Sequence, residues 1–138
     1  MSDNKDVLAR LYDAINGGDL DRVDEILADD FVEHEEFPGL DQSRESVKKL
    51  FGIARGAFTD FRMSAERYVS EDDIVVAWVR MTGTHTGEFM GIPASGNQLD
   101  LELADMVRVR DGKIVEHWGV SDSLVMMRQL GAMPPAPA

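Results

Sequence analysis

The sequence contains no cysteine and no long apolar run, and both absences exclude classes of protein. Without cysteine the chain cannot form a disulfide, a thiolate nucleophile, or a zinc or iron–sulfur site held by cysteines. No apolar run approaches the length that crosses a bilayer. The polar segment Met1–Asp6 also lacks the apolar core of a signal peptide. We therefore expect a cytoplasmic protein.

Basic residues are scarce as well, since 14 Lys and Arg stand against 26 Asp and Glu, which gives a formal charge of −12. Affinity for nucleic acids depends mainly on Lys and Arg that neutralise phosphates, so nucleic acid is not an expected partner. The same charge disfavours binding to an anionic membrane. The length of 138 residues suits one domain with a core and room for a pocket. We expect this domain over residues 1–132 and a disordered Pro/Ala-rich tail over 133–138.

Apolar residues in the first half recur with the period of a helix. Three helices follow from this pattern: one that presents Val7, Leu8, Leu11, Tyr12 and Ile15 on one face and ends at Asn16–Gly18, one from Leu20 to Leu27 capped by Asp19, and one from about Ser43 to Arg55 with Phe51 on its inner side.

The second half changes to the alternation of β-strands. Strands are predicted from Phe61 to the turn at 71–73, over 74–84, over 99–109 and over 114–122, with a hairpin turn at Asp111–Gly112 and a last helix over 123–130. This order predicts an α+β fold, in which three N-terminal helices pack in a strongly curved antiparallel sheet around a cone-shaped interior. A ligand would bind in that interior.

Asp105 interrupts an apolar strand face, because it stands in phase with Leu103 and Val107. A carboxylate among aliphatic side chains is costly unless it is paired or protonated. Either condition gives the carboxyl a raised or strongly coupled pKa, which is typical of a general acid or base. The alternative is a structural carboxylate paired with an arginine such as Arg80.

The last predicted strand also places polar side chains on a face that should be apolar. Alternation places Glu116, Trp118 and Asp122 on the face of Ile114, which we expect to point inward. Trp118 would then form a flat wall for a ring-shaped ligand, or simply pack in the core. Asp122 would serve as an acid or base, or as the N-cap of the helix that follows it.

Three histidines, His34, His85 and His117, could each transfer a proton near neutral pH. A metal site that combines them with Glu35 is conceivable, but no HxH or HExxH spacing supports it, and we predict no metal. The glycine-rich loop from Gly87 to Gly96 does not follow a strand and open a helix, so it does not predict a phosphate site.

Several motifs make the chain similar to a known family. They are Phe31-Val-Glu-His34, the segment Thr82-Gly-Thr-His-Thr-Gly-Glu-Phe-Met-Gly-Ile-Pro93, and Asp111-Gly-Lys-Ile-Val-Glu-His-Trp118 followed by Asp122 and Gln129-Leu-Gly131. Through them the chain resembles the SnoaL-like polyketide cyclase (ester cyclase) family of the nuclear-transport-factor-two-like superfamily. The loop departs from the family's usual Pro-Pro-Thr-Gly, because it reads Pro93-Ala-Ser-Gly96.

The resemblance implies a cone-shaped α+β barrel with a deep apolar pocket and no cofactor. It implies an enzyme that closes a ring of a polyketide ester by intramolecular aldol condensation, with an aspartate as acid and base. That role is carried over to Asp105 or Asp122. His34 and His117 are further catalytic candidates, and the candidates for substrate binding are Trp118, Trp78, His85, Phe51 and Phe89.

Two other functions remain open, because the superfamily also contains non-catalytic binders, isomerases and epoxide hydrolases. An epoxide hydrolase would use Asp105, Arg80 and Asp122 as a relay around a water molecule. The resemblance also implies a homodimer through the outer face of the sheet. Charged residues on that face would take part in the dimer or form a solvated surface; they are Asp100, Glu102, Arg108 and Arg110.

Overall fold

The computed structural model describes residues 3–133 as four α-helices, a short 3-10 helix and a five-stranded sheet. In chain order the elements are α1 (Asn4–Gly17), η1 (Leu20–Arg22), α2 (Val23–Ile26), β1 (Leu27–Glu33), α3 (Arg44–Ala57), β2 (Phe58–Glu71), β3 (Ile74–His85), β4 (Gln98–Arg110), β5 (Lys113–Ser121) and α4 (Ser123–Gln129). The predicted α+β fold is confirmed. Of the expected tail over 133–138, residues 134–138 lie outside the described part.

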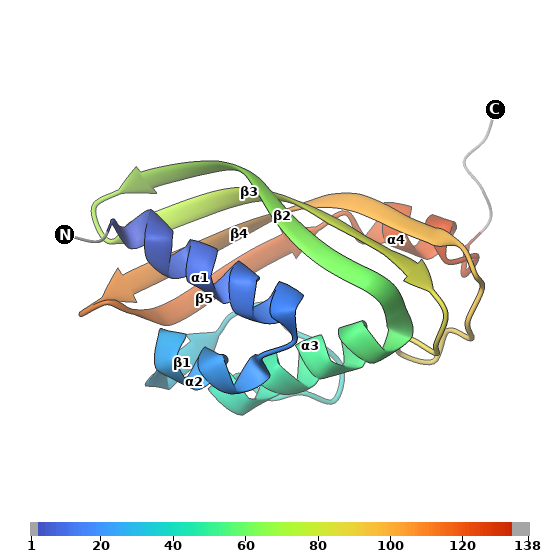
Figure 1. Cartoon of the computed structure of the whole chain (residues 1–138), viewed down its shortest axis with the longest axis horizontal. Helices are drawn as coiled ribbons and strands as arrows, with labels where there is room; N and C mark the ends of the chain where they lie inside the picture. Colours follow the sequence, from blue (N-terminus) through green and yellow to red (C-terminus); the bar gives the residue numbers. More distant parts are fainter. Residues whose placement is uncertain (1–2, 134–138) are drawn as a thin grey trace.

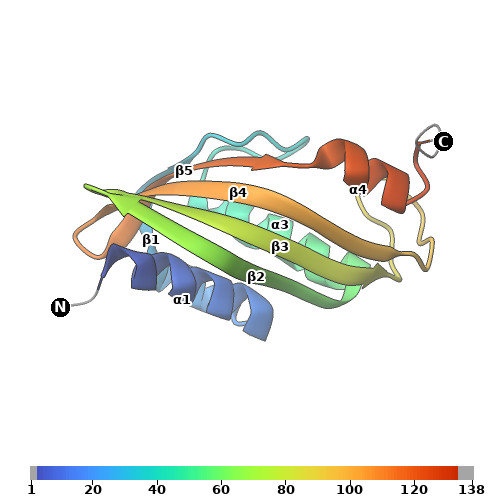
Figure 2. The same ribbon diagram turned by 90° about the horizontal axis from the view of Figure 1, so that it is seen from above.

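The strands lie in the order β1-β5-β4-β3-β2. Neighbours are antiparallel except β1, which runs parallel to β5 along one edge. Figure 1 shows the long strands curving around α1, and Figure 2 shows the sheet spread over α1 and α3. The sequence did not predict β1, because Asp29 and Asp30 interrupt any strand alternation there.

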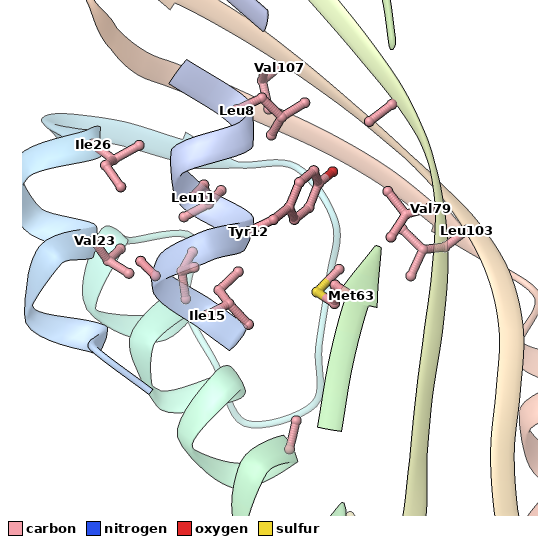
Figure 3. Packing of buried hydrophobic residues seen from close by; sticks show 14 of the residues in the cluster. Leu8, Leu11, Tyr12, Ile15, Val23, Ile26, Met63, Val79, Leu103 and Val107 are labelled. Atoms are coloured by element: carbon pink, nitrogen blue, oxygen red, sulfur yellow. The ribbon is translucent and has the colours of Figure 1, made fainter. Parts of the chain in front are cut away.

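The core lies between α1 and the inner face of the sheet (Figure 3). Asp3 and Asp6 form a capping box at the start of α1, and Gly18 ends the helix with a left-handed φ of 74°. Buried residues of α1, including Leu8 and Ile15, pack with β3 and β4 residues such as Val79. Burial of the apolar face of α1 thus stabilises the curved sheet.

Strand β5 contains a β-bulge that changes which of its side chains point inward. Arg108 pairs with Glu116, but the next residue of β4, Val109, pairs with Ile114, so Val115 has no direct partner. Ile114 and Val109 are both buried, whereas Glu116 shares the outer face with Arg108. The extra residue reverses the alternation after Ile114.

The sequence-based assignment of the β5 faces is therefore wrong beyond Ile114. His117 pairs with the buried Val107 and points inward, whereas Trp118 pairs with Met106 on the outer face. Simple alternation could not reveal the bulge, because His117 and Trp118 are each compatible with the inner or the outer face of the sheet.

The phase of β3, ambiguous from the sequence, is settled by burial. Val75, Ala77 and Val79 are buried, while Trp78 and Arg80 lie on the exposed outer face. Arg80 forms a bidentate ion pair with Asp100 of β4, through Nε–Oδ1 and Nη2–Oδ2 distances of 2.7 and 2.6 Å. Arg80 therefore does not pair with Asp105.

Helix α4 follows β5 and is fastened to β4. Asp122 caps it by accepting a hydrogen bond from the Val125 amide at 3.2 Å. The Gln129 side chain accepts from the Asp100 amide at 2.8 Å and donates to its carbonyl at 2.7 Å, as a neighbouring strand would. Among residues 3–133, no helix combines the length and apolar character needed to cross a membrane.

Candidate active site

A cavity opens between α1, α3 and the inner face of the sheet. It encloses about 1070 Å³, the solvent at its open mouth included. Most of its wall is aliphatic or aromatic, with Phe51 and Phe89 among the lining residues. Such a wall with few convergent polar groups is the usual form of a small-molecule site.

Polar side chains gather where β1, β5 and β4 lie side by side. His117 of β5 stands between two carboxylates: Nδ1 lies 2.5 Å from Glu33 Oε1 of β1, and Nε2 lies 2.7 Å from Asp105 Oδ1 of β4. The Tyr12 hydroxyl of α1 donates to Asp105 Oδ2 at 2.6 Å. The Tyr12 ring lies between α1 and the sheet in Figure 3. All four side chains line the cavity.

Glu35 brings a third carboxyl to this group from the segment after β1. Its side chain lines the cavity, and its backbone amide donates to Glu33 Oε1 at 3.0 Å. A Cβ built on Gly119 would collide with Glu35 Oε1 and lie 2.8 Å from His117 Cε1. The Glu35 carboxyl therefore occupies space that only glycine at position 119 leaves free.

The cluster perturbs several protonation equilibria. Burial alone lowers the pKa of His117, but the hydrogen bonds that it donates to Asp105 and Glu33, together with their charges, outweigh burial and raise the pKa to about 10. Burial raises the pKa of Glu35 to about 7, although the His117 charge opposes this. Burial, with the charge and hydrogen bond of Asp105, raises the pKa of Tyr12 well above its usual range. At neutral pH, His117 is a cation and Tyr12 is neutral.

Of the predicted catalytic residues, the structure brings Asp105 and His117 together in the cavity and leaves two outside its lining. His34 lies on the other side of the sheet edge, where Nε2 is 2.9 Å from Glu116 Oε2 and the ring stacks on Trp118 at 4.8 Å. Asp122 acts as the N-cap of α4. The relay of Asp105, Arg80 and Asp122 is not assembled.

Of the predicted substrate-binding residues, Phe51 and Phe89 line the cavity. Trp78 is 47% exposed on the outer face, and Trp118 lies on the same face two strands away, so neither lines the cavity. His85 is fully buried behind the wall, where its Nδ1 accepts the Ser95 amide at 3.2 Å.

Sequence reasoning missed Tyr12 and Glu33 as site residues and considered Glu35 only as a conceivable metal ligand. Tyr12 fits the apolar face of α1, so its hydroxyl gave no separate signal. Glu33 stands in the motif Phe31–His34, but its inward direction depends on β1, which was not predicted. Glu33 and Glu35 are two residues apart, which is the spacing of side chains on one face of a strand. This spacing was the available clue that the two carboxyls lie close together.

Glu33, Glu35 and His117 each place one ligand atom within 4.8 Å of the others. Both nitrogens of His117 are already hydrogen-bonded to carboxylates, so a metal ion would need His117 to release one of them. Within the described residues the hydrogen bonds of His117 therefore do not form a preformed metal site.

Comparison with known proteins gives a consistent result. Residues 5–130 match the family described as SnoaL-like polyketide cyclase. The aklanonic acid methyl ester cyclase DnrD of Streptomyces peucetius is 28% identical over 99% of this chain and 97% of its own length. The nogalonic acid methyl ester cyclase of Streptomyces nogalater is 28% identical over 88% and 92%. The crystal structure of IdmH from Streptomyces antibioticus aligns with a TM-score of 0.82 and 36% identity over 94% of this chain and 99% of that chain.

Proposed function

Because the chain belongs to the SnoaL-like polyketide cyclase family, we propose that it closes a ring of a polyketide ester by intramolecular aldol condensation, without a cofactor and with Asp105 as the acid–base residue. The observation that carries this proposal is the position of Asp105. Its carboxyl lines the apolar cavity, and Tyr12 and His117 hold it from both sides.

In the proposed reaction, Asp105 removes a proton from a carbon flanked by carbonyl groups. The resulting enolate attacks a second carbonyl of the same molecule, the new C–C bond forms, and the carbonyl oxygen becomes an alkoxide that takes up a proton. Substrate and product contain the same atoms, so the overall reaction is an isomerisation. Such a carbon acid needs only moderate base catalysis. The cavity contributes by holding the chain folded in a reactive conformation.

The cation of His117 supports this role of Asp105. An imidazolium that donates to the carboxylate orients it and offsets the cost of its burial. Tyr12 fixes the other oxygen. Asp122 has no comparable position, since its carboxylate caps α4 outside the cavity lining.

The test compares Asp105→Asn with the matched variant Asp122→Asn, using nogalonic and aklanonic acid methyl esters as substrates. Asp105→Asn should lower kcat by about 10²- to 10⁴-fold. Asp122→Asn should leave kcat unchanged, because asparagine also caps helices. Full turnover by Asp105→Asn would exclude this mechanism. Binding of the esters without turnover by the unmodified protein would instead indicate a non-catalytic binder.

We also propose that the protein forms a homodimer through an apolar patch on the outer face of the sheet. We call this surface the outer patch; it consists of Val69, Val76, Trp78, Ala104, Met106, Trp118 and Val120, in adjacent register positions of β2 to β5. Val69, Trp78 and Val120 are 59%, 47% and 71% exposed. Arg67, Arg80 and Glu102 border the patch, and an exposed apolar patch with a charged rim suits a self-complementary contact with a second copy.

A further inference from the structure

Of the three carboxyls in the cluster, that of Glu35 remains available to interact with a ligand. Hydrogen bonds engage the side chains of Glu33 and Asp105, whereas within residues 3–133 none is found to the Glu35 side chain. That side chain nevertheless turns into the cavity, above the bare backbone of Gly119. Gly119 is also the register partner of Asp105, so the two carboxyls approach the same part of the cavity.

We propose that Glu35 is a second catalytic residue of the cyclase, the acid that protonates the alkoxide formed when the ring closes. This inference rests on the proposed function and assigns one of its proton transfers. Asp105 takes the proton from carbon, and the Glu35 carboxyl gives its own proton to the new alkoxide. Exchange with water at the cavity mouth then returns a proton to Glu35 and removes one from Asp105, so no co-reactant is consumed.

The surroundings of Glu35 favour this assignment over the other donors of the cluster. Tyr12 already donates its hydroxyl proton to Asp105, and both N–H groups of His117 point at carboxylates. Either residue would have to break a buried hydrogen bond to protonate a substrate, which has a large cost. Glu35 has no such bond to break.

Burial keeps the proton of Glu35 available near neutral pH, and the charges that face Glu35 act in opposite directions. Glu33 of β1 and Asp105 of β4 repel a carboxylate there, and His117 of β5 attracts one. Asp41 lines the same cavity, while Tyr12 of α1 is neutral. Burial is the largest of these influences, and with the charges of Asp105 and Glu33 it raises the pKa of Glu35 to about 7. At pH 7 a fraction of the protein molecules therefore carries a proton on Glu35, as a general acid requires.

The experiment separates the two proton transfers by running the reaction with nogalonic acid methyl ester in D₂O. Exchange of deuterium into recovered substrate, above the rate without protein, reports removal of the carbon proton, and product formation reports ring closure. Glu35→Gln should keep protein-dependent exchange and lower ring closure by about 10²-fold or more. Glu35→Asp should recover part of the closure rate. Glu36→Gln is the matched control, because Glu36 is the exposed neighbour, and it should behave like the unmodified protein.

The outcomes are distinct. Ring closure at the unmodified rate in Glu35→Gln would overturn the role of Glu35 while leaving the cyclase proposal intact. Loss of both exchange and closure in Glu35→Gln would also overturn it, because the carboxyl would then be needed before the alkoxide exists. If the unmodified protein catalysed neither step, the proposed function itself would fail.

Discussion

His117 and Asp105 are joined across β5 and β4 by a 2.7 Å hydrogen bond, although neither is the register partner of the other. The partner of Asp105 is Gly119, whose missing side chain leaves the imidazole and the Glu35 carboxyl room beside it. This diagonal contact gives the cavity a fixed cation next to its central carboxylate.

The hydroxyl of Tyr12 should stabilise the fold through Asp105. In Tyr12→Phe, Asp105 Oδ2 loses its buried donor, and the free energy of unfolding should fall by about 1–3 kcal/mol. Urea denaturation measures this, with an unchanged m-value expected. Tyr68→Phe is the control. No hydrogen bond of the Tyr68 hydroxyl is found within the described residues, so its effect should stay within about 0.5 kcal/mol. Equal losses in both variants would contradict the prediction.

Stability should decrease as the pH rises from 7 to 10. The pKa of His117 is raised from 6.5 to about 10 in the folded state, so between these values the folded protein binds more protons than the unfolded chain. The stabilisation is fully present below pH 6.5 and is lost as the pH approaches 10. Thermal unfolding at several pH values measures the decrease.

The same pH series identifies the group responsible. His117→Gln should be less stable at pH 7 and should show a flatter decrease towards pH 10, because the titrating cation is gone. His34→Gln changes an exposed histidine on the other side of the sheet edge and should keep the slope of the unmodified protein. A slope in His117→Gln as steep as in the unmodified protein would assign the pH dependence to other groups.

The outer patch should be the dimer contact. Trp78→Glu places a charge in its centre and should convert a dimer to monomers in sedimentation or light-scattering measurements. Ile53→Glu changes an apolar side chain of similar exposure on α3, outside the patch, and should remain dimeric. A monomeric unmodified protein, or a Trp78→Glu dimer, would refute the proposal.

The sequence predicted the α+β fold because its apolar periods are long and regular. The face of α1 and the inner face of β4, including Asp105, follow the expected phase throughout. These elements bury one continuous side, so periodicity and burial agree. Phe51 and Phe89 lie in the cavity wall, and their part in substrate binding stays a prediction.

The candidate site was harder to predict, because it depends on local irregularities. Strand β1 carries acidic residues in its middle and pairs through only three register positions. No sequence pattern therefore indicated that Glu33 points inward. The bulge at Val115 exchanged the faces of His117 and Trp118. The proximity of Glu35 to Gly119 joins two distant segments, and neither residue indicates the other in the sequence.

The bulge at Val115 also offers a route by which the chemistry of the cavity could be altered without a new fold. If β5 kept Val115 but paired with β4 without the bulge, Trp118 and Glu116 would face the cavity and His117 would face outward, whereas deleting Val115 would leave the present faces unchanged. A shift of one residue in the pairing of β5 with β4 thus separates a cavity with a buried imidazolium from one with an indole wall.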